Sequence, residues 1–461
     1  MPIFEHSSAV PYPPGTVFTW HGRPLALERL MPPWESFRVE RRVGGIQDGG
    51  EVWIRQRFGG VWFRWHSRHH GYVEGEQFID EALEAPFPRW KHTHTFPSAD
   101  QGGCLVHDKI EYGFPAGRLG EAVLGRTVRR KLQRAFRYRH ETLQWDLARH
   151  AGFGAPPLRI LISGASGLLG RNLAAFLSTG GHEVHSLVRR QADPSRREIA
   201  WDPAAGRLDR AALEGFDAVV HLAGESLDRG RWTAARKREI LESRRTGTRL
   251  LSEGLASVAR PPRVLLSASA VGWYGDRGDE ILSESSEVGH GFLSEVAQAW
   301  EAAAEPARQA GIRVVHPRTG VVLSPNAGLL RRLLPVARLG LGPRLGDGRQ
   351  WVSWVSLDDV LYAFHSALTQ ERIEGPVNVT SPNPVRSADL MKVLGRVLRR
   401  PSGLPAPRSI VTAIYGEQAR DGLFSSARAI PAKLTASGFR FASASLDDAL
   451  RRCLGLRGEK A

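Results

Sequence analysis

From residue 159 onward, two spacings of hydrophobic residues alternate along the chain. Short runs of branched apolar residues predict buried strands, and apolar residues three or four positions apart predict helices. The strands are predicted at residues 160–163, 184–188, 198–201, 217–222, 263–269, 313–318 and 376–380, and the helices at 168–177, 236–255 and 291–309. Strands that alternate with helices in this way predict a doubly wound parallel α/β sheet, covered by helices on both faces.

The first 150 residues follow a different pattern, in which apolar and polar residues alternate over short segments between glycine-rich turns. Strands are predicted at residues 18–20, 52–54, 61–66, 77–80, 90–96 and 103–114, and a basic amphipathic helix at about 119–149. This pattern predicts an α+β domain in which an antiparallel sheet precedes a long helix. Four regions result: an N-terminal domain (1–150), a Gly/Ala/Pro linker (151–158), an α/β domain (159–370) and a small C-terminal lobe (371–461).

Composition narrows the class of protein. A content of 42% hydrophobic and 24% charged residues is typical of soluble globular proteins, and neither a membrane-spanning stretch nor a signal peptide is predicted, so we expect a cytoplasmic protein. Only Cys104 and Cys453 are present, without disulfide or zinc-type spacing. The net charge of +15 could serve nucleic acid, an acidic membrane surface or anionic ligands. Without a nucleic-acid motif we expect no nucleic-acid partner, and the oligomeric state and any acidic partner of the basic helix stay open.

Three glycines, Gly164, Gly167 and Gly170, stand between the first predicted α/β strand and its helix. A phosphate that approaches a helix N-terminus meets backbone N–H groups there, provided that no side chain blocks it. The turn therefore predicts a nucleotide-binding loop, with an ordinary glycine turn as the alternative. The next strand ends in Arg189 and Arg190, where NAD-binding sites usually carry an acidic residue. These cations predict NADP, and a solvated strand end is the alternative.

Five histidines, His66, His69, His70, His92 and His94, lie on predicted strands of the N-terminal domain. His92 and His94 share a strand face because strand side chains repeat every two residues. No carboxylate or cysteine stands at a recognised ligand spacing from them, so we predict hydrogen-bonded strand residues and no metal site.

The N-terminal pattern, with residues 75–78 and 86–94, resembles helix-grip domains of the START and Bet v 1 type (SRPBCC) that are fused to dehydrogenase-like domains. The resemblance implies a sheet that wraps the long helix around a hydrophobic, ligand-binding cavity.

The remainder resembles the atypical short-chain dehydrogenase/reductases of the epimerase family (NAD-dependent epimerase/dehydratase type) over residues 159–455. The matching motifs are residues 163–170, 181–184, 222–225, 243–244, 266–275, 318–323, 339–343, 348–351, 354–359, 430–434 and 438–441. The resemblance implies an extended Rossmann fold whose C-terminal lobe closes over the substrate. It also implies NADP(H) contacts from Gly164, Ser166, Gly167, Leu168, Leu169, Gly170, Val188, Arg189, Leu222, Ala223, Gly224, Glu239, Arg244 and Val322, although Arg244 could instead be a helix-surface cation.

The usual catalytic pair of this superfamily, a Tyr with a Lys four residues later, is absent. None of the seven tyrosines has Lys at the fourth position, and Leu293 and Ala297 occupy the matching places. Ser269 remains as a hydrogen-bonding group for the substrate oxygen. Tyr274 is the nominated proton donor, with a packed loop aromatic as the alternative.

These observations favour an NADP(H)-dependent oxidoreductase or epimerase-like enzyme that acts on an unidentified small-molecule substrate, which could be hydrophobic. The alternative is a non-catalytic NADP(H) sensor whose N-terminal domain holds a hydrophobic ligand. The missing Tyr/Lys pair favours the sensor, and Ser269 with the glycine loop favours the enzyme.

Overall fold

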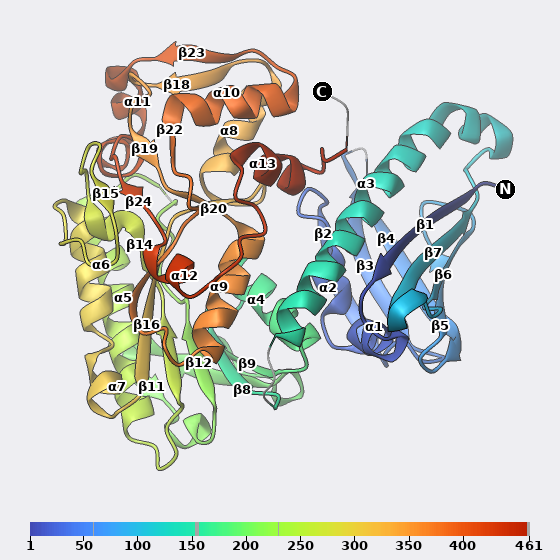
Figure 1. Cartoon of the computed structure of the whole chain (residues 1–461), viewed down its shortest axis with the longest axis horizontal. Coiled ribbons are helices and arrows are strands. Elements are labelled where there is room, and N and C mark those ends of the chain that lie inside the picture. Colours follow the sequence, from blue (N-terminus) through green and yellow to red (C-terminus); the bar gives the residue numbers. More distant parts are fainter. Residues whose placement is uncertain (59, 153–155, 229, 459–461) are drawn as a thin grey trace. The chain divides into compact units, whose positions relative to one another are not determined.

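The computed structural model describes residues 1–58, 60–152, 156–228 and 230–458 (Figure 1). The chain forms two compact units. The first comprises residues 1–155, 178–181 and 454–458, and the second comprises 156–177, 182–453 and 459–461. Most of the C-terminal region predicted as a lobe belongs to the second unit, and the predicted linker lies partly outside the described residues, at 153–155.

The first unit contains an antiparallel sheet of seven strands followed by a long helix (Figure 1). In spatial order the strands are β1 (Ile3–Val10), β7 (Cys104–Tyr112), β6 (Trp90–Thr95), β5 (Gln77–Glu84), β4 (Val61–Val73), β3 (Glu51–Phe58) and β2 (Phe37–Val43). Two short helices, α1 (Pro14–Gly22) and α2 (Ala26–Leu30), connect β1 to β2, and α3 (Gly117–Ala151) follows β7. The apolar face of α3 packs on β1 and β7 through Val128, Phe136, Leu143 and Leu147.

The strand predicted at residues 18–20 is wrong, because these residues belong to α1. Pro14 opens this helix, where its fixed φ and missing N–H group suit the first turn. Val17, Phe18 and Trp20 of this helix are buried. A short apolar run of this kind has no spacing that separates a helix from a strand.

The second unit is built on a parallel sheet, in the order β10 (Glu198–Asp202), β9 (Glu183–Val188), β8 (Arg159–Ser163), β12 (Ala218–His221), β13 (Val264–Ser267), β16 (Arg313–Thr319) and β21 (Gly375–Val379). A short strand, β14 (Ser269–Ala270), continues beside β16, and β11 (Arg207–Leu208) adds an antiparallel edge. The first strand of the unit lies in the centre and the order reverses there, as in doubly wound sheets. The predicted Rossmann-type α/β fold is confirmed.

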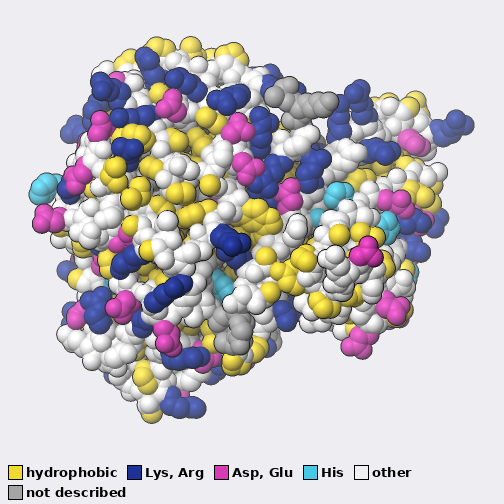
Figure 2. Space-filling model, viewed as in Figure 1, with side chains coloured by type: hydrophobic (Ala, Val, Ile, Leu, Met, Phe, Trp, Pro, Cys, Tyr) yellow, Lys and Arg dark blue, Asp and Glu magenta, His cyan; other side chains and the backbone are white. Residues whose placement is uncertain are grey.

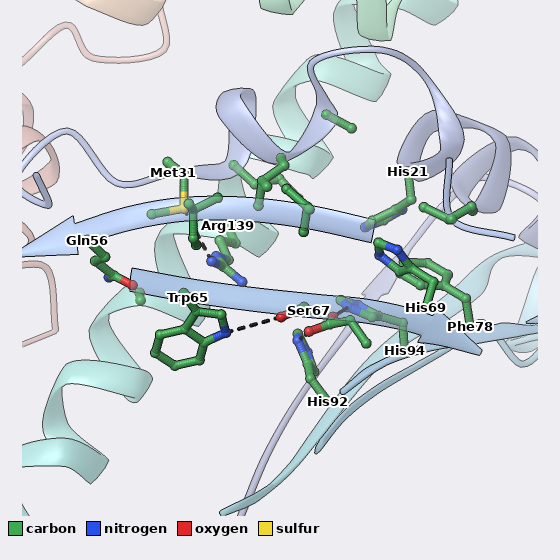
Figure 3. A pocket seen from close by; sticks show the side chains of 18 of the residues that line it. His21, Met31, Gln56, Trp65, Ser67, His69, Phe78, His92, His94 and Arg139 are labelled. Atoms are coloured by element: carbon green, nitrogen blue, oxygen red, sulfur yellow. Dashed lines mark hydrogen bonds and ion pairs between the residues drawn. The ribbon is translucent and has the colours of Figure 1, made fainter. Parts of the chain in front are cut away.

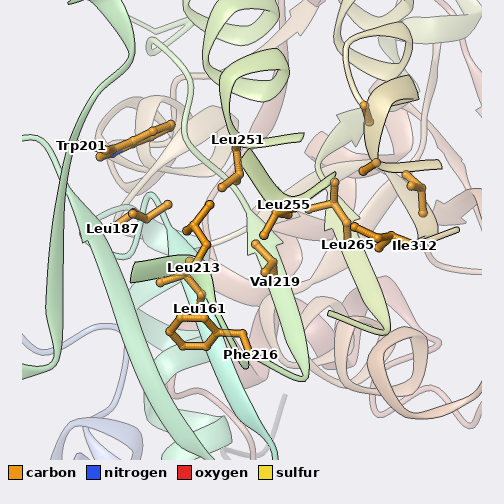
Figure 4. Close-up of a cluster of buried hydrophobic side chains, with 13 residues drawn as sticks. Leu161, Leu187, Trp201, Leu213, Phe216, Val219, Leu251, Leu255, Leu265 and Ile312 are labelled. Atoms are coloured by element: carbon orange, nitrogen blue, oxygen red, sulfur yellow. The ribbon is translucent and has the colours of Figure 1, made fainter. Parts of the chain in front are cut away.

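Helices cover this sheet: α4 (Leu168–Thr179), α5 (Ala234–Ala256), α6 (Phe292–Ala302), α7 (Glu305–Gln309) and α9 (Leu357–Thr369). The single helix predicted at 291–309 is divided into α6 and α7, because Pro306 has no N–H group to continue the helical ladder. Between the sheet and α5, a buried cluster includes Leu161, Val219, Leu251 and Leu265 (Figure 4).

The later part of the unit contains α8 (Gly328–Arg338), α10 (Ser387–Leu398), α11 (Arg408–Tyr415), α12 (Ala432–Ala436) and α13 (Leu446–Leu454). Short strand pairs join them: β15 (Ile281–Leu282) with β24 (Arg428–Ala429), β17 (Val321–Leu323) with β20 (Trp354–Ser356), β18 (Gly342–Leu345) with β23 (Ser402–Ala406), and β19 (Trp351–Val352) with β22 (Val385–Arg386). Among the described residues, no helix has both the length and the apolarity needed to cross a bilayer. Lys and Arg side chains are spread over the face shown in Figure 2, interspersed with Asp and Glu.

Candidate functional site

Ser163 ends β8 and ties the glycine turn to the neighbouring strand. Its Oγ accepts hydrogen bonds from the N–H groups of Leu222 (3.1 Å) and Ala223 (3.3 Å). The Ser163 Oγ also lies 2.7 Å from Nδ1 of His221, the last residue of β12. Because the oxygen already accepts twice, its own proton points to Nδ1 of a neutral imidazole. Ser163 thus fixes the carboxyl ends of β8 and β12 side by side.

The predicted glycine turn lies at this edge of the sheet, between β8 and the start of α4. Gly164 has φ +71°, and a Cβ there would lie 2.8 Å from the carbonyl carbon of Leu222. A Cβ at Gly170 would lie 2.3 Å from the Gly164 carbonyl oxygen. A Cβ at Gly167 would lie 3.3 Å from the nearest atom, the Gly164 carbonyl oxygen, so packing within the chain requires a glycine much less strongly at this position. Gly164 and Gly170 are thus required by packing within the chain, and Gly167 is the glycine whose bare backbone suits the close approach of a diphosphate to the helix N-terminus.

Two neighbouring arginines follow β9 at the same edge, after the half-buried Val188. Arg190 donates to the Glu198 carboxylate and to the carbonyl of Gln191 (3.0 Å). Arg189 is exposed, and no hydrogen bond or ion pair links it to another residue in the described part of the chain. Arg189 is thus the member of the pair that is available to an anionic ligand.

Arg244 of α5 is buried behind the loop that follows β12, so it is not a helix-surface cation. Its Nη1 donates to the carbonyls of Glu225 (3.0 Å) and Ile240 (3.1 Å), and its Cζ lies 4.7 Å from the centre of the Trp300 ring. A Cβ at Gly224 would lie 3.2 Å from this Cζ. Burial lowers the pKa of Arg244 to about 10. In this arrangement Arg244 braces the loop, and its predicted contact with the cofactor stays a prediction.

The remaining predicted cofactor residues occupy varied positions. Leu222, Ala223 and Gly224 follow β12 directly beside the glycine turn. Glu239 is exposed on α5 and forms an ion pair with Arg236 (2.8 Å). Val322 is half-buried on β17.

Ser269 of β14 belongs to a buried polar cluster with Glu301 of α6 and Arg318 of β16. The Ser269 hydroxyl donates to Glu301 Oε1 over 2.6 Å. Arg318 donates to both oxygens of the same carboxylate, each over 2.9 Å. The Arg318 guanidinium also lies 3.8 Å from the centre of the Trp273 ring. Since the proton of Ser269 is held by Glu301, its Oγ can face a ligand only as an acceptor.

The geometry of Tyr274 favours the packed-aromatic alternative. Its side chain is 0% exposed, and its hydroxyl lies 2.9 Å from the Ser283 carbonyl and 2.7 Å from Asn378 Oδ1. Burial raises the pKa of this hydroxyl. These contacts occupy the proton that the predicted donor role requires, and that role stays a prediction.

The first unit holds a cavity of about 420 Å³ (Figure 3). It is lined largely by apolar side chains, together with polar and charged ones that include Asp80, His92, His94, Arg139, Lys131 and Glu35. Arg139 Nη2 lies 3.5 Å from Met31 Sδ, and its buried Nε has no hydrogen-bond partner among the described residues. The cavity therefore contains a guanidinium with unused donor capacity.

A network of histidines and aspartates extends from the wall of this cavity, across β5, β6, β7 and α3. Nε2 of His92 and Nδ1 of His94 lie 2.8 and 2.7 Å from Asp108 Oδ1. The other Asp108 oxygen lies 2.6 Å from His140 Nε2. Burial alone would lower the pKa of His94, but Asp108 and then Asp80 raise it to about 9. Burial alone would raise the pKa of Asp108, but His94, His140 and His92 outweigh it and hold this pKa well below the usual range.

The prediction that the strand histidines are hydrogen-bonded is confirmed for His66, His69, His92 and His94, and Nε2 of His70 lies 3.2 Å from a carboxylate oxygen of Glu81. Sequence spacing gave no sign of Asp80 or Asp108. They lie on the two strands that flank β6, so antiparallel pairing brings them to the histidines. To find these two carboxylates from the sequence, one would need the pairing register of β5, β6 and β7.

The doubly wound sheet, with its glycine turn at the point where strand order reverses, defines a dinucleotide-binding type of α/β protein. Residues 160–380 match the NAD dependent epimerase/dehydratase family, and residues 406–453 match a domain of unknown function, DUF1731. An epimerase family protein of Mycobacterium tuberculosis is 43% identical over 63% of this chain and 96% of its own length. The chain belongs to the epimerase family of atypical short-chain dehydrogenase/reductases.

Two crystal structures extend the comparison. A nucleoside-diphosphate sugar epimerase from Corynebacterium glutamicum is 35% identical with a TM-score of 0.80, and the match covers 98% of this chain and 90% of that one. The human epimerase family protein SDR39U1 with NADPH is 29% identical with a TM-score of 0.60, over 64% of this chain and 99% of that one. The first of these matches therefore includes both units.

Proposed function

We propose that the chain is an NADP(H)-dependent oxidoreductase or epimerase-like enzyme of the atypical short-chain dehydrogenase/reductase type. The observation that supports NADP(H) as the cofactor is that Arg189 is exposed beside the glycine turn, while Arg190 is bonded to Glu198. The NADPH in the human relative's structure supports the same choice. Membership of a family named for epimerases and dehydratases supports an enzyme over a non-catalytic sensor.

The turn at 164–170 would hold the diphosphate, Leu222, Ala223 and Gly224 would line the cofactor, and Arg189 would pair with the 2′-phosphate. The bound nicotinamide would supply the hydride chemistry. Ser269 would accept a hydrogen bond from a substrate hydroxyl, because its own proton is held by Glu301. Redox chemistry tolerates the missing Tyr/Lys pair better than a Tyr-dependent epimerisation does.

Calorimetric titration with NADPH and NADH tests the cofactor. We expect Arg189→Ala to weaken NADPH about tenfold to a hundredfold and to leave NADH unchanged, since a charge-assisted phosphate contact contributes about 1.5–3 kcal/mol. Arg190→Ala is the matched control, with a small effect on both cofactors. Equal affinities of the wild-type chain for NADPH and NADH would contradict the proposal.

Turnover is tested by following nicotinamide absorbance with a panel of alcohols and carbonyl compounds. Once a substrate is found, Ser269→Ala should lower its turnover while NADPH affinity is retained. Unchanged turnover would remove Ser269 from the site. NADPH binding without turnover of any compound would favour the sensor.

We further propose that the first unit is a helix-grip domain of the START and Bet v 1 type, whose cavity takes an apolar molecule with an anionic end. The apolar lining and the 420 Å³ volume support the first part, and the unused donors of Arg139 support the second. Dodecanoate and dodecanol form a matched pair of probes. Dodecanoate should bind at least about tenfold more tightly, and Arg139→Met should abolish this difference. Lys131→Met should preserve it, because Lys131, which also lines the cavity, is paired with Glu35 over 3.9 Å. Equal binding of both probes to the wild-type chain would contradict an anionic end.

A further inference from the structure

We propose that Asp80, His92 and His94 form a site for a divalent transition-metal ion of the zinc class. Asp80 Oδ2 lies 3.3 Å from His92 Nδ1 and 3.2 Å from His94 Nε2, and one ligand atom from each residue falls within 4.8 Å of the others. Zinc bonds of about 2.0–2.2 Å place tetrahedral ligand atoms roughly 3.3–3.6 Å apart. The two edges from Asp80 therefore already have nearly the required length. This inference does not rest on the proposed cofactor.

The opposite ring nitrogens of both histidines meet a second carboxylate. His92 Nε2 and His94 Nδ1 each contact Asp108 Oδ1, at 2.8 and 2.7 Å. Metal-binding histidines usually donate their other N–H to a carboxylate or carbonyl, which fixes the tautomer and the ring orientation. Asp108 would hold the proton of His92 on Nε2 and that of His94 on Nδ1. A bound ion would displace the protons that the nitrogens facing Asp80 share with its carboxylate, because metal ligation requires their lone pairs.

The layers of the network match those of a metal site with an open position. Asp80, His92 and His94 line the cavity (Figure 3 labels both histidines), whereas Asp108 and His140 are buried and do not line it. His140 supports Asp108 over 2.6 Å, and its Nδ1 lies 2.6 Å from the hydroxyl of Ser8. Three protein ligands with a fourth position open are typical of zinc sites that bind a water or an exogenous ligand. The open position would face the cavity.

The charges of the network are compatible with a divalent ion that displaces protons from the histidines. Asp80 and Asp108 are the two carboxylates of the network, and with neutral histidines they would neutralise a 2+ charge in this buried environment. Buried charges are otherwise costly unless they are paired. Two imidazoles and one carboxylate suit zinc, iron or cobalt better than magnesium or calcium.

Cobalt is the probe for this site, in the full-length chain after treatment with a chelator. We expect one equivalent of Co²⁺ with the visible ligand-field band of a low-coordinate nitrogen/oxygen site, displaced by one equivalent of Zn²⁺. His94→Ala and Asp80→Ala should lose that equivalent. Asp108→Asn, which changes only the outer contact, should bind about ten to a hundred times more weakly. His107→Ala, on the same strand as Asp108 but bonded to Ser7, should bind as the wild type does.

Metal content is measured by mass spectrometry, and circular dichroism checks that each variant is folded. Failure of the wild-type chain to take up one equivalent of cobalt or zinc overturns the proposal without recourse to a variant. A folded His94→Ala chain that retains the equivalent with unchanged affinity also overturns it, because the ion then lies elsewhere.

Discussion

The cluster of Ser269, Glu301 and Arg318 gives a sharp stability prediction. Glu301→Gln keeps the size of the side chain but removes the negative charge that two Arg318 nitrogens contact at 2.9 Å. The Arg318 side chain is 3% exposed, so water cannot replace the lost partner. Removing one member of a buried ion pair costs about 3–5 kcal/mol. We expect about 3 kcal/mol, because the Trp273 ring 3.8 Å away still faces the cation.

A second variant separates the ion pair from the packing. Glu301→Leu with Arg318→Met replaces both charges by apolar groups, which is often close to neutral for a buried pair. The double variant still leaves the Ser269 hydroxyl without its acceptor, at a cost of about 1–2 kcal/mol. It should therefore be more stable than Glu301→Gln alone.

Urea unfolding followed by circular dichroism and tryptophan fluorescence measures these free energies. Because the chain has two compact units, two transitions are to be expected, and a variant of the first unit identifies which is which. Glu301→Gln should shift the transition of the second unit. A change below about 1 kcal/mol, or a double variant less stable than the single one, would refute the reasoning.

Three further predictions concern buried contacts elsewhere. Arg29 donates to both oxygens of Asp146 at 2.7 and 2.8 Å, and both residues are at most 2% exposed. Arg29→Ala should therefore lower the unfolding free energy of the first unit by about 3–5 kcal/mol, and a decrease below about 1 kcal/mol would contradict this. Burial, with the nearby Arg244 charge, lowers the pKa of His221 to about 4 from 6.5, so its neutral form stabilises the fold above pH 6.5 and stability falls as pH drops towards 4. Between pH 7.5 and 5.0 the unfolding free energy of the second unit should fall by about 2 kcal/mol through His221. The His221→Gln variant should show a smaller decrease in the same urea titrations, and an equal decrease would exclude His221 as the cause. Gly170→Ala should destabilise the second unit by at least about 1–3 kcal/mol, because its Cβ would meet backbone 2.3 Å away, whereas Gly167→Ala should be nearly neutral for unfolding; equal costs would contradict the packing argument.

The parallel sheet was predictable because its strands are buried on both faces and therefore appear as continuous apolar runs. The residues between β8 and α4 were predictable for a different reason, because few local structures require three glycines at this spacing. In the first unit the strands β1 and β2 were not predicted, and α1 was taken for a strand. The apolar residues of β1 and α1 are buried because they pack against α3 and the rest of the sheet, which local spacing does not reveal.

The polar parts of the sites depended on contacts between distant elements. Arg244 could be placed on a helix from sequence, but its burial depends on Trp300 and on the carbonyl of Glu225. Asp358 and Asp359 stand at the start of α9, as helix caps often do, yet Ser356 caps this helix. Asp359 instead accepts from the N–H groups of residues 442 and 443, and Asp358 pairs with Arg452. Carboxylate partners of this kind leave no spacing signal.

The orientation of Ser269 bears on the direction of the proposed reaction. A serine whose proton is free can donate to a substrate carbonyl, and one whose proton is held can only accept from a hydroxyl. Glu301 is kept as an acceptor by two Arg318 contacts, so the Ser269 proton stays on the carboxylate side of the bond. Under the proposed function, the site would therefore bind the alcohol more tightly than the corresponding carbonyl compound. The same constraint explains how Ser269 could position a substrate without the Tyr/Lys pair, because positioning an alcohol requires only an acceptor.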